Sequence, residues 1–137
     1  MEIAMSTGFN TDGTMFSLGD EESEFFKTDD FGWSWSQVWL APGVPFNSGD
    51  AKLSAIAMSK DYFSDQTLLV GTMSSQGPTR NISRGLVSTG SGVSRSTNGG
   101  DSWAASNAGL NSTDLNITAL ATAKPRMAFL ATDKGTF

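Results

Sequence analysis

The sequence predicts an all-β fold built from repeated units. Short runs of strand-forming residues lie between clusters of Gly, Asn, Asp and Ser, and no stretch keeps the 3.6-residue apolar period of a helix for three turns. The pattern of these runs also recurs along the chain, which is typical of a repeat protein. With 137 residues, 10% of them aromatic, the chain is long enough for one domain with a core, or for part of a larger domain.

The first element of the repeat is an apolar strand that ends at a hydroxyl residue. Ile3-Ala4-Met5-Ser6 recurs 53 residues later as Ile56-Ala57-Met58-Ser59. A looser third copy begins at Ile117 and continues through Ala128–Thr132 to Gly135. The chain therefore contains two close copies and one incomplete copy of the unit.

The second element is a turn followed by a strand. Asp12–Phe16 matches Asp65–Leu69 at the same offset of 53 residues, and each copy then runs to a glycine. Asp12 and Asp65 occupy equivalent positions, whereas a catalytic acid needs to occur only once. We therefore predict that both aspartates form turns.

The third element is an eight-residue motif with the pattern [Ser/Thr]-x-[Asp/Asn]-x-Gly-x-Ser-Trp. Asp or Asn can accept backbone hydrogen bonds within a turn, Gly supplies a positive φ, and Trp begins the return strand. The pattern predicts a β-hairpin with a structural role at each occurrence. Its residues are Thr28, Asp30, Gly32, Ser34 and Trp35, and then Ser96, Asn98, Gly100, Ser102 and Trp103.

The motif resembles the Asp-box, or bacterial neuraminidase repeat, of β-propeller proteins. The stretches Ser59–Thr72 and Gly92–Trp103 are similar to bacterial members, and the likeness covers nearly the whole chain. Asn98 stands where Asp is usual, and the third repeat ends before any box. The resemblance implies a partial β-propeller of about two and a half four-stranded antiparallel blades, near residues 1–40, 53–107 and 116–137.

Each repeat is then interpreted as a blade with strands A to D. We expect strand A near 2–6, 53–58 and 117–122, strand B near 14–18, 67–71 and 127–131, strand C near 24–28 and 92–96, and strand D near 33–39 and 102–105. Propellers typically close with four to eight blades, and an open edge invites pairing. We therefore expect completion by self-association into a homo-oligomer, or by the remainder of a larger propeller.

The two boxes are 68 residues apart, so the second repeat carries about 15 extra residues between strands B and C, within Thr72–Ser91. The resemblance implies that this loop lies on the usual ligand face. We expect a solvated, tolerated surface insertion. The alternative is recognition of an anionic group or a partner, for which the candidate ligand residues are Arg80, Asn81 and Arg84. The corresponding loop of the first repeat, Asp20–Glu24, is acidic and is expected to be a solvated face rather than a Ca²⁺ site.

Three tryptophans, Trp33, Trp35 and Trp39, alternate along the predicted first strand D. Alternate residues of a strand share one face. Such a row can stack on sugar rings, but we expect it to pack in the core between blades. The box residues Trp35 and Trp103 are expected to be structural.

Composition excludes several functions. The absence of His and Cys excludes disulfides, zinc fingers and triads that need histidine, and no cofactor or metal is expected. The net charge of −5 argues against nucleic acid, and no apolar run approaches a membrane span of ~20 residues. The resemblance suggests an extracellular or cell-surface bacterial protein, although the start has no signal-peptide pattern.

The resulting hypothesis is a non-catalytic propeller module that binds a glycan or a protein, or acts as a scaffold; no catalytic residue is assigned. One alternative is a fragment of a glycoside hydrolase that uses two carboxylates. Another is an incomplete gene product without independent activity. A sialidase is disfavoured, because the chain has four Arg and a single tyrosine, Tyr62, and lacks the arginine motif of that family.

Overall fold

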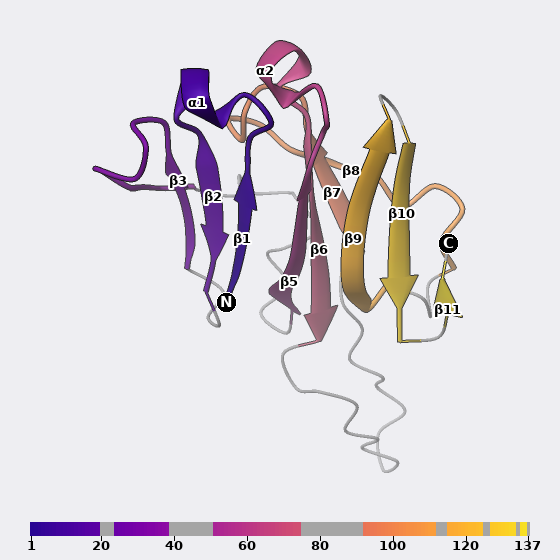
Figure 1. Cartoon of the computed structure of the whole chain (residues 1–137). Helices are drawn as coiled ribbons and strands as arrows, with labels where there is room; N and C mark the ends of the chain where they lie inside the picture. The colour runs from indigo at the N-terminus through magenta and orange to yellow at the C-terminus, as the bar shows by residue number, and fades with distance from the viewer. Residues whose placement is uncertain are drawn as a thin grey trace.

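The computed structural model is mostly β and contains three antiparallel sheets (Figure 1). It describes residues 1–19, 24–38, 51–74, 92–111, 115–124, 127–133 and 135–136. In each sheet the strands are adjacent in chain order, so every connection joins neighbouring strands. Sheet 1 comprises β1 (Glu2–Met5), β2 (Met15–Leu18), β3 (Phe25–Thr28) and β4 (Ser36–Gln37); sheet 2 comprises β5 (Ala51–Met58), β6 (Leu68–Ser74), β7 (Val93–Ser96) and β8 (Ala104–Ala105); sheet 3 comprises β9 (Ile117–Lys124), β10 (Met127–Thr132) and β11 (Gly135–Thr136).

The strands lie where the repeat predicts them, but both fourth strands are shorter than expected. Two helical turns, α1 (Phe9–Asp12) and α2 (Tyr62–Asp65), also connect the first two strands of sheets 1 and 2 at the same end of the molecule (Figure 1). Neither of these four-residue turns is long and apolar enough to cross a membrane, and this holds for every helix that the structure describes.

The α1 and α2 turns are held by equivalent side-chain hydrogen bonds. The Ser6 hydroxyl donates to Asp12 at 2.5 Å, and the Ser59 hydroxyl donates to Asp65 at 2.7 Å. The second oxygen of each aspartate accepts the backbone N–H two residues on, at 2.8 Å in both copies. The prediction that Asp12 and Asp65 form turns is therefore confirmed.

The sheets stack in order, with β1 beside β5 and β5 beside β9 (Figure 1). Between sheets 1 and 2 lies an aromatic and aliphatic core, in which the Phe16 ring is 5.7 Å from Phe25 and 6.1 Å from Tyr62. Alternation along β2 and β3 places Phe16 and Phe25 on the inner face, and the α2 turn adds Tyr62. The aliphatic partners from sheet 2 are Leu53, Ile56, Met58, Leu68 and Val70.

A smaller core separates sheets 2 and 3. It contains Leu69 and Val93 from sheet 2 and Ile117 from β9, with Leu120 and Leu130 packed against them. Gly71 permits the close approach of the two sheets, because a Cβ at this position would lie 2.5 Å from Cγ2 of Ile117. Sheet 3 is thus fixed to sheet 2 mainly through β9, with Leu130 of β10 added.

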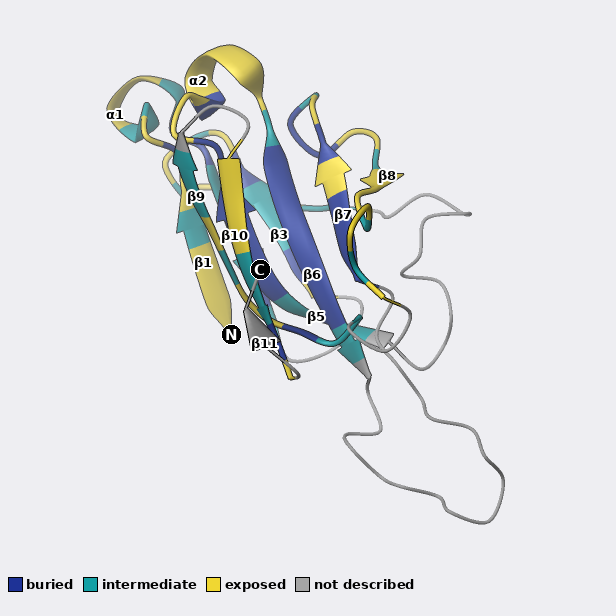
Figure 2. Cartoon of the chain, turned by 90° about the vertical axis from the view of Figure 1, so that its right-hand side faces the viewer, coloured by how far each residue is buried: buried dark blue, intermediate teal, exposed yellow. Residues whose placement is uncertain are grey.

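The outer faces of the stack are exposed, whereas the middle sheet is buried (Figure 2). On sheet 1 the exposed apolar residues include Ile3 and Met5 of β1. On sheet 3 the side chain of Phe129 is 50% exposed. Within the described residues, no element of this chain covers these side chains.

The expectation of a buried tryptophan row is wrong for Trp33, whose side chain is 91% exposed. The reason is local: β4 begins only at Ser36, so Trp33 belongs to the hairpin turn and not to the strand. Trp35 is 41% exposed, because no described element stacks on the outer face of sheet 1. Trp39 lies outside the described residues.

Candidate functional site

The first box closes its hairpin through one carboxylate. Asp30 accepts the Thr28 hydroxyl at 2.7 Å, the Ser34 N–H at 2.9 Å and the Ser34 hydroxyl at 2.5 Å. The Thr28 hydroxyl in turn accepts the Gly32 N–H at 3.0 Å. The hydrogen bonds from Ser34, followed by that from Thr28, lower the pKa of Asp30 from 3.8 to about 2.

The second box has the same geometry with an amide in place of the carboxylate. Oδ1 of Asn98 accepts the Ser102 N–H at 2.9 Å and the Ser96 hydroxyl at 2.9 Å. Its Nδ2 donates to the Ser102 hydroxyl at 2.8 Å, so this serine accepts where Ser34 donates. Because both groups of the amide find partners, Asn98 replaces Asp without loss of the turn.

Backbone conformation explains the glycines of the boxes. Gly32 and Gly100 have φ of 89° and 96°, a region that favours glycine. The preceding residues, Phe31 and Gly99, also have positive φ, of 63° and 69°. The positive φ thus also occurs at the unspecified position before the box glycine, and in the first box a phenylalanine adopts it.

The two box tryptophans differ in their surroundings. The Trp103 indole donates from Nε1 to the Gly100 carbonyl at 2.9 Å and lies 5.8 Å from the Phe25 ring of sheet 1. Trp35 lies on the uncovered face of sheet 1 and is more exposed. The polar groups of both boxes bond within their own hairpins, which indicates a structural role.

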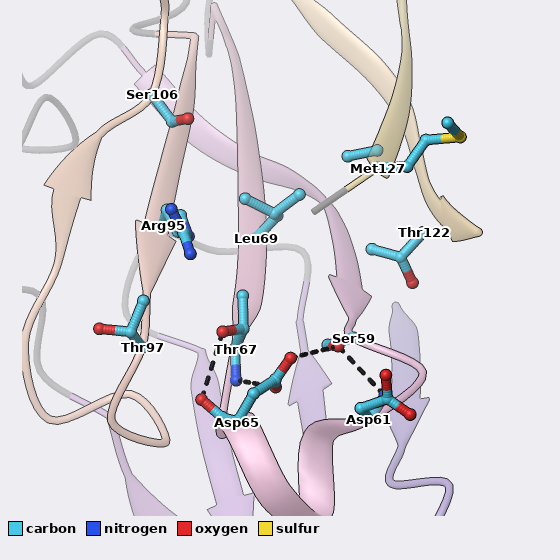
Figure 3. A pocket seen from close by; sticks show the side chains of 11 residues that line it. Ser59, Asp61, Asp65, Thr67, Leu69, Arg95, Thr97, Ser106, Thr122 and Met127 are labelled. Carbon is cyan, nitrogen blue, oxygen red and sulfur yellow. Dashed lines mark hydrogen bonds between the residues drawn. The ribbon is translucent and has the colours of Figure 1, made fainter. Parts of the chain in front are cut away.

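A cavity of about 800 Å³ lies at the junction of sheets 2 and 3 (Figure 3). Leu69 of β6 and Arg95 of β7 form one wall, and Thr122 of β9 stands opposite. Asp61 and Asp65, from the α2 turn, lie at one end. The remaining lining residues are Ser59, Thr67, Thr97, Ser106, Met127 and Ala128.

The three charged side chains in the described lining of the cavity, Asp61, Asp65 and Arg95, make different interactions. Both carboxylate oxygens of Asp65 accept hydrogen bonds, from Ser59 and from Thr67, as those of Asp12 do outside the cavity. Asp61 contributes its backbone N–H to the Ser59 hydroxyl and leaves its side chain exposed at the rim. Arg95 is exposed on β7 and lies in the cavity (Figure 3). This arrangement suits binding through shape, hydroxyl groups and one cation.

Metal chemistry finds no support in the part of the chain that the structure describes, where no group of three or more Asp, Glu, His or Cys side chains could hold an ion. The candidate ligand residues Arg80, Asn81 and Arg84 lie outside the described residues, as does most of the acidic run Asp20–Glu24.

Sequence reasoning missed the cavity and Arg95. The offsets of the repeat relate Leu69 to Phe16 and Arg95 to Lys27, but no local pattern in the sequence indicates that a cavity lies beside them. Searches against protein-family models, curated proteins and solved structures found no match to this chain.

Proposed function

We propose that this chain is a non-catalytic binding or scaffold module of the Asp-box β-propeller type. Its three sheets are successive blades, and the boxes clamp the third and fourth strands of the first two. Supporting this are the resemblance of both boxes, their equivalent hydrogen bonds, and the stacking of the sheets with their first strands adjoining. The outer faces with Ile3 and Phe129 are then places where further blades pack, from a second copy or from the rest of a larger propeller.

The main support for a non-catalytic role is that both carboxylate oxygens of Asp65 are already hydrogen-bonded. Glycosidases that use two carboxylates need both groups free to face the scissile bond, about 5–10 Å apart. Asp65 is held on both oxygens by its own turn, and the equivalent Asp12, which does not line this cavity, makes the same bonds. Among the described lining residues this leaves the Asp61 carboxylate without an acidic partner.

Protein is favoured over glycan as the ligand. Sugar rings are commonly held by stacking on aromatic side chains, and no aromatic residue is among the described lining of the cavity. Leu69 and Met127 give it apolar surface, and Thr97 and Ser106 give it hydrogen-bonding groups. Such a mixture is typical of protein interfaces, which combine an apolar centre with polar groups.

The proposal is tested by assaying hydrolysis on a panel of chromogenic glycosides and plant and bacterial polysaccharides. Wild type and Asp61→Asn are compared, with Asp101→Asn as a matched control, because Asp101 is exposed and lies outside the cavity. We expect no turnover by any of the three proteins. Turnover by wild type that is lost in Asp61→Asn and kept in Asp101→Asn would establish a carboxylate enzyme and overturn the proposal.

A further inference from the structure

The second box contains a pair of residues with covalent chemistry of its own. Asn98 is the single asparagine of the chain that a glycine follows. In such a pair the backbone nitrogen of the glycine can attack the side-chain amide of the asparagine, because glycine has no side chain to obstruct the approach. The equivalent pair of the first box, Asp30 and Phe31, has neither the amide nor the glycine. The two hairpins therefore share a geometry but differ in reactivity.

The reaction is deamidation, and its only co-reactant is water. The Gly99 nitrogen loses its proton to base and forms a bond to Cγ of Asn98, after which the Cγ–Nδ2 bond breaks and ammonia leaves. The intermediate is a cyclic succinimide. Water opens this ring at either carbonyl, giving aspartate at position 98 or isoaspartate, in which the backbone runs through Cγ. In both cases water is consumed and ammonia is released in equal amounts.

In the folded chain both reacting groups are engaged in hydrogen bonds. The Gly99 N–H donates to the Gln66 carbonyl at 3.0 Å, and Gly99 is buried, so its proton is shielded from base. Oδ1 of Asn98 accepts the Ser96 hydroxyl and the Ser102 N–H, each at 2.9 Å. Nδ2 of the same amide donates to the Ser102 hydroxyl at 2.8 Å. The closed hairpin thus protects the pair from reaction.

The strand that completes this hairpin is the weakest part of sheet 2. β8 pairs with β7 at two positions, and both of its residues are exposed (Figure 2). By contrast, β6 and β7 pair at four positions. Elements with few buried contacts open locally at a lower free energy than the core strands do. We therefore expect the box to open while the rest of the sheet stays folded.

We propose that Asn98 is a spontaneous deamidation site that is gated by opening of the β7–β8 hairpin. The closed box suppresses the reaction, and each opening releases the amide of Asn98 and the N–H of Gly99 together. This inference goes beyond the function proposed above and does not depend on it. It assigns a covalent modification to the position at which the clamping residues of the two boxes differ.

The two products affect the hairpin differently. Aspartate at position 98 reproduces the first box, where Asp30 accepts both the N–H and the hydroxyl of Ser34, so the hairpin closes again. Isoaspartate lengthens the backbone before Gly99 and displaces Gly100, whose carbonyl accepts the Trp103 indole N–H at 2.9 Å. Opening therefore leads either to a closed hairpin with an added negative charge or to a hairpin that no longer closes.

The test follows the mass of the proteolytic peptide that contains Asn98 while the full chain is incubated at mildly alkaline pH. The reference is the same chain unfolded in guanidinium chloride. We expect the unfolded chain to deamidate at Asn98 to both products, and the folded chain to react at least about tenfold more slowly, because opening must precede reaction. Equal rates in the folded and unfolded chain, or no deamidation of the unfolded chain, would overturn the inference.

Ser102→Ala weakens the clamp without changing the reacting pair. It removes the hydroxyl that accepts from Nδ2 of Asn98, and the loss of one hydrogen bond should speed deamidation of the folded chain about fivefold. Ser34→Ala makes the same change in the first box and should react at the wild-type rate. Dichroism should show that both variants keep the wild-type β signal. An unchanged rate in Ser102→Ala, or an equal acceleration in Ser34→Ala, would contradict gating by the box.

The box tryptophans give a second, independent pair of variants. Trp103→Ala removes the indole that donates to the Gly100 carbonyl, so the hairpin opens more often and Asn98 should react at least about tenfold faster. Trp35→Ala is its control in the first box and should leave the rate at Asn98 unchanged. The same rate in both tryptophan variants would overturn the gate.

Asn98→Asp is a fixed copy of the aspartate product. It lacks the reacting amide, so the mass gain at this peptide should disappear, and its Tm at neutral pH should equal that of wild type. A mass gain that persists in Asn98→Asp would place the reaction at another residue and overturn the assignment, and a clearly lower Tm would show that aspartate does not close the box again.

Discussion

The two box tryptophans form a matched pair for measuring how much a covering sheet contributes to the stability of the fold. Trp35 and Trp103 occupy the same motif position, and each follows a serine that bonds the box Asp or Asn. Trp103 lies against the Phe25 ring of another sheet, whereas Trp35 is 41% exposed and no described element of another sheet covers it. Replacing each by Ala therefore removes the same atoms from covered and uncovered surroundings.

The expected loss in free energy of unfolding differs severalfold between Trp103→Ala and Trp35→Ala. Truncating a buried Trp to Ala costs about 3–5 kcal/mol, and the partial burial of Trp103 places it near the lower end, at about 3 kcal/mol. Within that figure, the contact with the Phe25 ring contributes about 0.5–1.5 kcal/mol. The hydrogen bond from Nε1 to the Gly100 carbonyl contributes about 1 kcal/mol. For Trp35 we expect less than about 1 kcal/mol, as for other surface substitutions.

Urea unfolding followed by far-UV dichroism measures both costs. For a chain of this size, about 3 kcal/mol also corresponds to a loss of roughly 10 °C in Tm. The measurement is repeated over a hundredfold range of protein concentration, because association would cover Trp35 and raise its cost with concentration. Equal costs for Trp35→Ala and Trp103→Ala at the lowest concentration would refute the argument, since packing between sheets would then not distinguish the two positions.

Three further predictions concern single groups. Asp30 has a pKa of about 2 in the folded chain and a higher one when unfolded, so its stabilising effect is present above pH ~4 and is lost as the pH falls toward 2. Asp30→Asn, which copies Asn98, should therefore reduce the fall in Tm between pH ~4 and pH ~2. An unchanged fall in Tm would contradict the lowered pKa of Asp30. Burial, followed by the nearby Asp12 charge, raises the pKa of Tyr62, the single tyrosine, from 10.0 to about 12. Its phenolate absorbance should therefore appear near pH 12, and folding should lose stability as the pH rises above 10; an absorbance midpoint near 10 in folded protein would show that the ring is not buried. Gly71→Ala places a Cβ 2.5 Å from Cγ2 of Ile117. This overpacking should lower the free energy of unfolding by about 1–3 kcal/mol, and amide hydrogen exchange should accelerate first in β9 and β10. An equal acceleration in all three sheets would argue against a local clash.

Much of the fold follows from the repeat in the sequence. The offset of 53 residues relates Ser6 to Ser59, and in the structure these serines begin identical turns. The box pattern likewise specifies its own hydrogen bonds, because every polar group it requires is local in sequence. Asn98 shows how far such reasoning extends, since an amide satisfies the same N–H donor as the carboxylate of Asp30.

Features that depend on distant neighbours were not predictable in this way. Alternation of Trp33 and Trp35 predicts a shared face only if a strand runs through both, and β4 begins after them. The burial of a box tryptophan depends on whether another sheet covers it, which a motif does not encode. The cavity escaped prediction for the same reason, because it is defined by where sheet 3 stops covering sheet 2.

The apolar side chains beside the cavity are explained by the packing of sheets 2 and 3. Leu69 and Val93 stand at the positions equivalent to Phe16 and Phe25, and both belong to the buried core that Ile117 of β9 completes. The cation of sheet 1 is also kept, as Arg95 in place of Lys27, and Arg95 is exposed where it lines the cavity. The apolar positions of the repeat are therefore filled by packing between neighbouring sheets, whereas the cavity lies where that packing ends, beside Arg95 and Ser106.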